Sequence, residues 1–393
     1  MSGTALQDFA DFVEATGPNY VTGPKSMVME AVKNTYWFGR LIKGKNSKKK
    51  MLTGGSSINE SIIFKDNGAA ETYLPGESHD WQNPQRLKKA TAYMRYVMAH
   101  MSWVEQEILE NEVISSGTED ARFQEYVNLY EEKRSIMIVN LWNFLEDLLW
   151  QTPIPTQMES NDGTEPYSVP AFVNEDTNGL FDPQASAAFT TVEGLNPTDS
   201  ALDSRWAPKT ASYSTESATA DTGIFYNLDL LMSDLDYEQA PTMQEYWQDP
   251  RYNKHMIVTS TRGVNAYKLL LRSSQDHFVA GPQDPAYNKP QYYGIPIDRA
   301  STLDTAALYD SGSSTVVAEN TAANGGPRYY CLNAEYLYPC FHNQRYFHKQ
   351  DVTKHHNVPD TWVMPIQVWY NLLCTSRQRQ GILSPSVAGP LFY

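Results

Sequence analysis

A glycine-lysine motif that could bind phosphate lies near the start of the chain, in the stretch FGRLIKGKN (residues 38–46). Gly39, Gly44 and Lys45 match the first seven positions of a P-loop, G-x-x-x-x-G-K. The eighth position should be Ser or Thr to hold magnesium, but it is Asn46. The motif should also open a helix whose amino terminus faces the phosphates, whereas NSKKKMLTGGSS follows, with a glycine pair and no apolar stripe. We therefore expect a basic loop here and no nucleotide or other cofactor.

Cysteine and histidine side chains that could bind a metal gather in one late section. They are Cys331, Cys340, His342, His348, His355 and His356. Their spacing contains neither the C-x₂₋₄-C pair nor the H-x₃₋₅-H pair of zinc sites. His355 and His356 are adjacent, so on a strand they would point to opposite faces. We expect structural histidines and no metal site.

Nucleophilic catalysis has no recognisable anchor in this sequence. There is no G-x-S-x-G motif, and none of the three cysteines stands in a known catalytic motif. Carboxylates are plentiful, but the sequence cannot pair them, so a glycosidase-like pair stays open. The sequence predicts no catalytic residue.

The bulk composition limits the partners and the compartment. The net charge is −15, so the chain as a whole repels polyanions and is a poor candidate for a free nucleic-acid binder. The odd number of cysteines favours free thiols in a reducing compartment. No export signal is visible, and no run approaches the ~18 apolar residues of a membrane span. The 25 Tyr and 9 Trp would suit either extensive interfaces or a large aromatic core.

The first half of the chain predicts a hairpin, a strand and helices. SIIFKDNGAAETYL is typical of a hairpin, because Asn67-Gly68 supplies the positive φ of a tight turn. RLKKATAYMRYVMAHM fits both strand and helix spacing, and we expect a strand ending near His100. Ser102 and Glu105 have capping-box spacing, which predicts a short helix directly after it.

The longest helical pattern begins at a second capping box, Ser116 with Glu119, and ends before Pro153. Its apolar stripe consists of Phe123, Val127, Tyr130, Met137, Leu141, Phe144 and Leu148. Residues 153–222 are rich in Ser, Thr, Asn, Asp, Gly and Pro. That composition favours a long loop or a weakly structured insertion.

The second half predicts further helices and strands, so the fold class is α+β. IFYNLDLLMSDLDY indicates a helix, HMIVTSTRGVNAYKLLLRSS a strand, a turn and a helix, and YYGIPIDRA another strand. A late half-buried strand is predicted by the alternation of Trp362, Met364, Ile366, Val368, Tyr370 and Leu372. Pro365 within this strand favours a bulge or an edge position.

The order of these elements resembles the major capsid protein of tailed bacteriophages, the Hong Kong 97-like fold. GRLIKG…GGSSINESIIF looks like the entry into that family's extended E-loop, and the stripe from Phe123 takes the place of its long spine helix. HMIVTSTRGVNAYKLLL and YYGIPID resemble parts of the axial domain. RYYCLNAEYLYPCFH and DTWVMPIQVWYNLLCTSRQRQGIL resemble strands that return to the peripheral domain.

The resemblance implies a division of the chain into five parts. They are an N-terminal arm (1–39), an E-loop (40–85), a peripheral domain of strand, short helix and spine helix (86–152), an axial domain (153–327) that carries the polar insertion 153–222, and the return strands of the peripheral domain with a C-terminal tail (328–393). The arm is short, so scaffolding is expected from a separate protein. We cannot match the lysine, asparagine and glutamate of the family's crosslink, so that chemistry is not carried over.

The function that the resemblance implies is structural. The chain would assemble with itself into pentamers and hexamers of an icosahedral shell that encloses double-stranded DNA without sequence-specific binding. The further partners would be a scaffolding protein, a portal and a decoration protein, without a membrane. The protein would be located in the virion after assembly in the host cytoplasm. The alternatives are the shell of a cellular nanocompartment and a soluble hydrolase or nucleotide-dependent enzyme.

The basic run then suggests a contact between subunits. Many copies of charge −15 must approach one another, yet salt screens repulsion beyond ~8 Å, so local complementarity should dominate. The lysines of this run are Lys43, Lys45, Lys48, Lys49 and Lys50. We expect them to lie against acidic surface of an adjacent subunit, near Glu125, Glu131 and Glu132. A solvated basic run is the alternative, because exposed ion pairs contribute only ~0–1 kcal/mol each.

Overall fold

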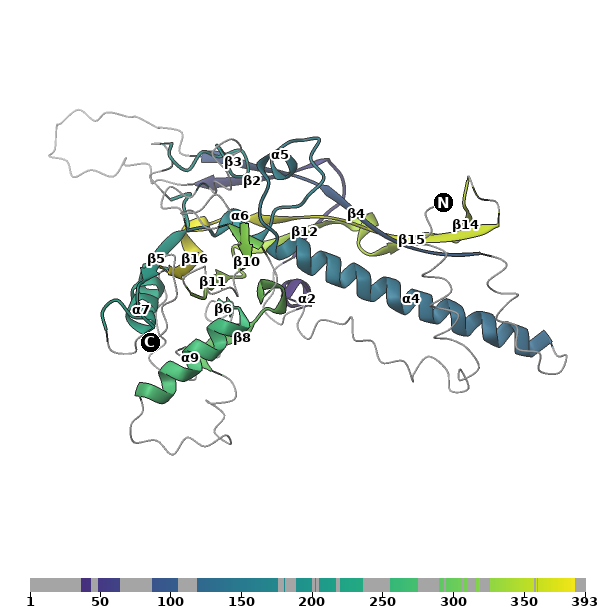
Figure 1. Cartoon of the computed structure of the whole chain (residues 1–393). Coiled ribbons are helices and arrows are strands. Elements are labelled where there is room, and N and C mark those ends of the chain that lie inside the picture. The colour runs from purple at the N-terminus through teal and green to yellow at the C-terminus, as the bar shows by residue number, and fades with distance from the viewer. Residues whose placement is uncertain are drawn as a thin grey trace, which may run out of the picture. The chain divides into compact units, whose positions relative to one another are not determined.

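The structure is a computed structural model of the 393-residue chain (Figure 1). It describes residues 37–43, 49–63, 87–104, 119–175, 180, 189–199, 202, 205–216, 220–235, 255–274, 290–292, 295–304, 307–309, 316–318, 326–356, 358 and 360–385. Within these ranges the side chains of residues 43, 63, 119–132, 272–274, 307–309 and 316–318 are not described. The chain forms two compact units, and the division falls inside the long helix and two of the strands.

The first unit contains Val97–Phe144 and Phe347–Val368 and combines a helix with antiparallel strands. Its elements are most of α4 (Glu119–Trp150) and β4 (Arg95–Val104), with β13 (His348–Lys349), β14 (Thr353–Lys354) and the first part of β15 (Thr361–Cys374). β13 and β14 pair antiparallel with β15, and β4 also pairs with β15. Lys133 of α4 donates to the Ser102 carbonyl of β4 over 3.3 Å, and the Trp142 ring stacks on Phe347.

The second unit contains Asn34–Tyr96, Leu145–Tyr346 and Trp369–Tyr393, and its largest sheet has six strands. In spatial order these are β5 (Lys209–Tyr213), β16 (Gly381–Pro385), β11 (Tyr329–Asn333), β6 (His255–Thr259), β8 (Ile295–Arg299) and β7 (Gln291–Tyr292). β5 runs parallel to β16 and β6 runs parallel to β8, while the other neighbours are antiparallel. β11 is buried along its whole length, as expected for a central strand.

Smaller strand pairs complete the second unit. β1 (Lys50–Leu52) runs parallel to β12 (Leu337–His342), which pairs antiparallel with the end of β15. β2 (Ser57–Ile63) pairs antiparallel with β3 (Leu87–Tyr93), and β9 (Ala307–Tyr309) with β10 (Val316–Ala318). β2 overlaps the first arm of the expected hairpin, but its partner β3 begins only at Leu87, and the expected second arm with the turn at Asn67-Gly68 lies outside the described residues.

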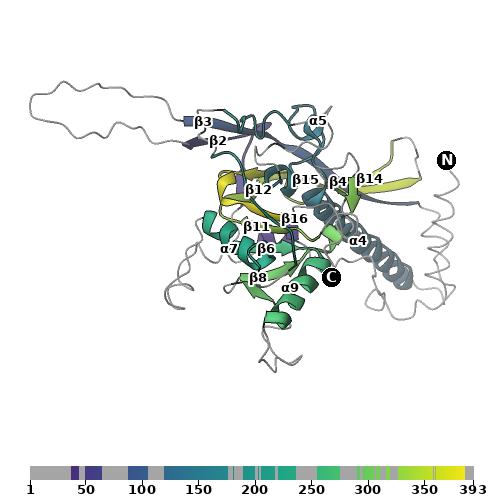
Figure 2. The same ribbon diagram turned by 60° about the vertical axis from the view of Figure 1, so that its left-hand side comes forward.

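The helices of the second unit are short compared with α4. They are α2 (Trp37–Lys43), α5 (Pro155–Met158), α6 (Val169–Phe172), α7 (Ile224–Asp234) and α9 (Thr261–Ser274), with 3₁₀ turns η4 (Ser301–Asp304), η6 (Asn343–Arg345) and η7 (Arg377–Arg379). Figure 1 shows α7 and α9 beside the six-stranded sheet, and the second view in Figure 2 agrees. No helix in the described part of the chain combines the length and the apolar character that crossing a membrane requires.

One apolar core joins α7, α9 and the six-stranded sheet. Its buried members include Leu228 and Leu231 of α7, Tyr267 of α9 and Ile257 of β6. A Cβ atom at Gly381 of β16 would lie only 2.9 Å from a methyl carbon of Leu231, so glycine allows α7 to approach this strand closely.

α4 confirms the predicted long helix, but only part of its predicted stripe is buried. Met137, Leu141 and Leu148 are buried, as expected from their helical spacing. Phe144 is 51% exposed, and its place in the core is taken by Leu145, which is fully buried. The side chains of Phe123, Val127 and Tyr130 lie outside the described set.

Of two further predictions, one was wrong and one was confirmed. The short helix expected from Ser102 does not begin there, because β4 continues to Val104 with Met101 and Trp103 buried in alternation. β15 confirms the predicted strand, and the pairing beside Pro365 contains a bulge, one of the two positions expected for this proline. The register shifts by one residue between the pairs Lys349–Ile366 and Thr353–Val363, and the Pro365 carbonyl accepts the Gln350 amide at 3.0 Å.

The segment expected to be a weakly structured insertion is instead packed. Its backbone is mostly irregular, as its composition predicted, with only short helices and β5 in the described parts of 153–222. Yet Tyr167, Phe172 and Trp206 are buried to 2% exposure or less. Polar contacts described below explain how a segment so poor in apolar periodicity can pack.

Candidate functional site

Arg95 at the start of β4 is 1% exposed and holds the segment that follows α4. Its guanidinium donates to five backbone carbonyls, those of Met158, Ser160, Asn161, Gly163 and Glu165. A guanidinium offers five N–H donors in a fixed plane, so one side chain can satisfy a whole irregular turn. The contacts explain how residues 159–165, which follow α5, remain ordered without a helix or strand of their own.

Arg377 of η7 makes a second anchor of the same type. Its Nε and Nη2 donate to the Phe172 carbonyl at 3.0 and 2.9 Å, and its Nη1 donates to the Trp206 carbonyl at 2.9 Å. Burial lowers the pKa of Arg377 to about 10, which leaves the group charged at neutral pH. The end of α6 and the turn before β5 are thereby fixed to the segment between β15 and β16.

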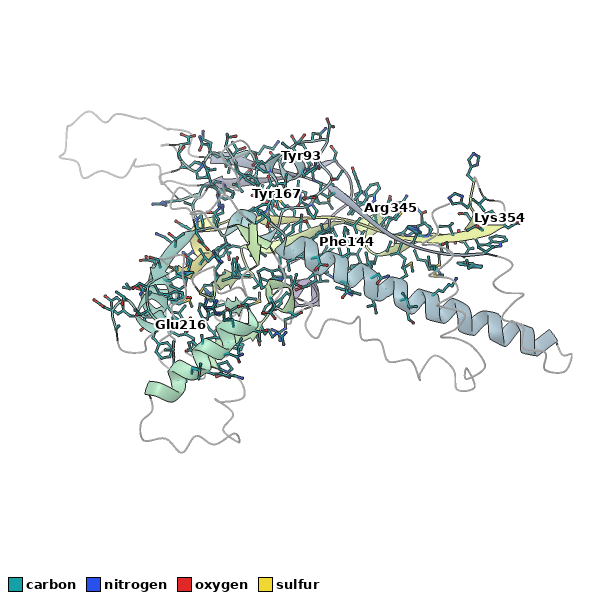
Figure 3. All side chains as sticks on the ribbon, in the orientation of Figure 1. Tyr93, Phe144, Tyr167, Glu216, Arg345 and Lys354 are labelled. Carbon is teal, nitrogen blue, oxygen red and sulfur yellow. The ribbon has the colours of Figure 1, made fainter. Side chains whose placement is uncertain are left out.

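Asn371 of β15 links three segments through one buried amide. Its Oδ1 accepts the Tyr167 amide at 2.8 Å, and its Nδ2 donates to the Tyr93 carbonyl at 2.6 Å. The amide therefore joins the end of β3 to the last part of β15 and to the irregular segment. Figure 3 labels Tyr93 and Tyr167 among these contacts.

The hydroxyl group of Tyr167 lies between the backbone amide of Glu193 and the carboxyl group of Glu159. The Glu193 amide donates to this oxygen at 3.0 Å, and the hydroxyl donates to Glu159 at 3.5 Å. Oε1 of Glu193 accepts the Cys374 amide at 3.0 Å, and its backbone carbonyl accepts the Thr91 amide of β3 at 2.8 Å. Glu193 thus connects β3, β15 and the irregular segment at one point.

Both carboxyl groups have raised pKa values. Burial raises the pKa of Glu193 to about 8, and the nearby carboxylates Glu60 and Glu159 raise it further, against the effects of the Cys374 amide and Arg377. Burial raises the pKa of Glu159 to about 7, against hydrogen bonds from Thr191 and Tyr167 and the charge of Arg377. These groups therefore titrate near neutral pH within the anchor of β3.

The described residues show no activated nucleophile and no metal group. Cys331, Cys340 and Cys374 are free and buried, and burial raises the pKa of Cys331 to about 12 and the pKa of Cys374 further. A thiol in such an environment stays protonated and unreactive. His348, His355 and His356 are exposed, and no group of three or more metal-ligating side chains occurs within the described ranges.

The glycine-lysine motif does not have P-loop geometry. Gly39 lies inside α2, and this helix ends at Lys43, whereas a P-loop would place its helix after the second glycine. Phe38, also in α2, donates its amide to Glu146 of α4 at 2.9 Å. Residues 44–48 lie outside the described set.

The lysines expected to contact a neighbour are only partly described. Lys50 of β1 forms an ion pair with Glu60 of β2, and Lys49 lies over the Tyr346 ring at 5.2 Å. Lys43 lies at the end of α2 without a described side chain, and Lys45 and Lys48 are outside the described residues. Glu125, Glu131 and Glu132 all lie on α4, but their side chains are likewise not described. The contact stays a prediction.

Exposed apolar residues on α7 and α9 were not singled out from the sequence. Tyr226 and Leu230 of α7 are 49% and 47% exposed, and Leu269 of α9 is 58% exposed. The signal was present, because Tyr226 and Leu230 are four residues apart and face away from the buried positions Leu228, Leu231 and Met232. Periodicity alone shows an apolar helix face but not which of two apolar faces is buried.

The comparisons with known proteins identify the fold. No family model and no curated protein matches the chain. Among solved structures, a chain of the cyanophage A-1(L) capsid asymmetric unit is similar, with a TM-score of 0.56 and 11% identity over 96% of this chain and 99% of that chain. A chain of the capsid of the native GTA particle has a TM-score of 0.52 and 10% identity over 95% and 99%. The resemblance to phage capsid proteins is confirmed at the level of the fold: over nearly its whole length, the chain has the fold of these capsid chains.

Proposed function

We propose that this chain is the major capsid protein of a tailed bacteriophage and assembles with itself into the icosahedral shell around the genome. The observation that carries the proposal is the coverage, since the similarity spans 96% of this chain and 99% of a cyanophage capsid chain. Because the similarity extends over almost the whole of both chains, little of this chain remains that could form an additional catalytic domain. The protein is then structural and not an enzyme.

The finer parts of this proposal rest on the resemblance of the sequence to the capsid family. Residues 1–39 would form the N-terminal arm, 40–85 the E-loop, 86–152 and 328–393 the peripheral domain with the C-terminal tail, and 153–327 the axial domain. Pentamers and hexamers would form in the host cytoplasm with a separate scaffolding protein, a portal and a decoration protein. The net charge of −15 suits a container that encloses double-stranded DNA without binding its sequence.

Particle size tests the proposal most directly. The full chain is expressed, purified and examined by light scattering and electron microscopy at several salt and protein concentrations. We expect large closed or irregular shells. A chain that stays strictly monomeric under every assembly condition would contradict the proposal. DNA-packaging proteins among the copurifying partners would support a phage shell, whereas a cargo enzyme would indicate a nanocompartment.

A further inference from the structure

The helices α7 and α9 differ in charge although they pack on the same sheet. α7 reads IFYNLDLLMSD, with Asp229 and Asp234 and no basic residue. α9 reads TRGVNAYKLLLRSS, with Arg262, Lys268 and Arg272 and no acidic residue. Each helix also exposes large apolar side chains, as described above. The two helices thus present surfaces of opposite charge, each with an apolar element.

The two helices are held side by side within one chain. The rings of Phe225 on α7 and Tyr267 on α9 meet edge to face, with centroids 5.1 Å apart. Both helices contribute to the same apolar core, with α7 over β5 and β16 and α9 against β6 and β8. Phe225 and Tyr267 therefore mark the inner flank of each helix, where it faces the other.

The exposed apolar residues lie on the outer flanks. An α-helix turns by ~100° per residue, so Leu230 lies ~140° around α7 from Phe225, and Asp234 ~180°. On α9, Leu269 lies ~160° around from Tyr267 by the shorter way. Because these outer flanks point away from each other, the outer flank of α7 cannot reach that of α9 within one chain.

The charged residues of α9 and α7 differ in how far their charge is balanced within the chain. Arg262 lies close enough to Glu216 to influence its carboxyl group, so part of its charge is balanced within the chain. Lys268 is partly exposed and lies next to Leu269. On α7, Asp229 and Asp234 are both exposed, but Asp229 accepts a hydrogen bond from Tyr292, and Asp234 lies at the end of the helix. Among the described side chains of the two helices, Lys268 and Asp234 are therefore the charges most available to a partner.

We infer that the outer flank of α7 in one copy binds the outer flank of α9 in the next copy. The occupant of each surface is a second copy of this chain, because each surface supplies the charge and the apolar side chains that the other needs. Leu230 and Tyr226 would pack near Leu269, with Asp234 close to Lys268. The contact joins two different surfaces, so copies associate head-to-tail. They close into a ring when the rotation between neighbouring copies is a whole fraction of a full turn. This inference rests on the proposed function, and it names the contact that would build one capsomer.

Charge reversal in a double-mutant cycle tests the contact. Asp234→Lys and Lys268→Glu are made singly and together in the full chain, and the protein concentration at which particles appear is measured by light scattering. Each single variant should raise this threshold about three- to tenfold, since a favourable pair of up to ~1 kcal/mol becomes a like-charge pair. The double variant should return the threshold to near the wild-type value, because it restores an opposite pair with the same net charge.

A matched control separates the local pair from net charge. Asp351 is an exposed acid outside both helices, so Asp351→Lys combined with Lys268→Glu also restores the wild-type net charge but not the pair. This control should not rescue assembly. Circular dichroism of each unassembled variant confirms that it is folded.

The outcomes distinguish the inference from the proposed function. If the wild-type chain stays strictly monomeric under every assembly condition, the proposed function fails. If it forms particles and the single variants assemble at the wild-type threshold, the head-to-tail contact is overturned. If the Asp351 control restores assembly as fully as the Asp234→Lys/Lys268→Glu variant does, the head-to-tail contact is also overturned. Net charge would then explain the recovery in both variants.

Discussion

Glu193 places a buried carboxyl group at a backbone position of positive φ, +54°, between β3 and β15. Its backbone accepts a hydrogen bond from Thr91 and its side chain accepts one from Cys374, so it fixes the start of the β2–β3 pair to the core. A residue in this conformation is retained only where its surroundings require it. The protonation state of Glu193 should therefore affect the stability of this unit.

Replacing Glu193 by Gln should reduce the pH dependence of stability. The pKa of Glu193 is raised from 4.5 to about 8, so the folded chain keeps a proton that the unfolded chain loses between these values. The free energy of unfolding of the wild type should therefore fall as pH rises through this window and level off above about pH 8. Gln keeps the oxygen that accepts the Cys374 amide but does not ionise. Relative to the wild type, Glu193→Gln should gain at least about 1.4 kcal/mol between pH 5 and pH 9, the equivalent of one pK unit.

Urea unfolding of the unassembled chain at both pH values measures this difference. Glu159, with its pKa raised to about 7, should leave a smaller slope of the same sign in the variant. Asp360→Asn serves as control, because Asp360 is exposed, and its curve should run parallel to that of the wild type. Parallel curves for Glu193→Gln and the wild type would show that Glu193 does not hold its proton in the folded state.

At the scale of elements, the segment after α4 is held by polar contacts, and Arg95 provides the largest group of them. Replacing Arg95 by Met keeps an unbranched apolar side chain in place of the aliphatic part of Arg95 but leaves five backbone carbonyls without their donor. We expect a loss of about 3 kcal/mol or more in the free energy of unfolding, because each buried group without a partner costs ~1–3 kcal/mol. Hydrogen exchange of residues 158–165 should also become faster than in the wild type.

Arg345→Met is the matched control for this substitution. Arg345 makes a cation–π contact with Trp369 at 5.5 Å and is partly exposed, so its loss should cost only ~0.5–1 kcal/mol (Figure 3). Equal effects of the two variants, or unchanged exchange in residues 158–165, would contradict the role of Arg95 as an anchor.

The elements with regular apolar spacing could be predicted from the sequence. α4, α7, the strand-helix pair β6–α9 and β15 all follow stripes or alternation that a buried face imposes. The helix at Ser102 was wrong because four residues of capping-box spacing cannot outweigh a strand whose alternation continues through Met101 and Trp103. The packing of residues 153–222 could not be predicted, because it depends on buried side chains more than a hundred residues away, such as Arg377 on Phe172.

At the scale of the whole molecule, the surfaces that face other copies are the least predictable part. The buried faces of α7 and α9 pack against the sheet of the same chain. A single sequence contains no signal that shows what the outer flanks of these helices contact in another copy. The basic run of Lys43–Lys50 was visible at once, but only the structure shows that Lys50 pairs with Glu60 in its own chain. A test of the expected contact between subunits must leave that pair intact.

Replacing Lys45 and Lys48 by Glu meets this requirement. If these lysines bind acidic surface around Glu131 and Glu132 of an adjacent copy, the double variant should assemble at a higher threshold concentration than the wild type. Its assembly should also depend less on salt, since the wild-type attraction is screened as salt rises and the variant has lost that attraction. Light scattering between low and physiological salt measures both quantities.

Adding Glu131→Lys and Glu132→Lys to the same chain tests the partner as well as the lysines. The fourfold variant has the wild-type net charge and restores opposite charges only if the two segments meet across copies. Recovery of the threshold and of its salt dependence would therefore place the basic run against α4 of a neighbour. An unchanged threshold in Lys45→Glu/Lys48→Glu would instead mean that the run is solvated in the shell, because exposed lysines that touch no partner contribute almost nothing to association.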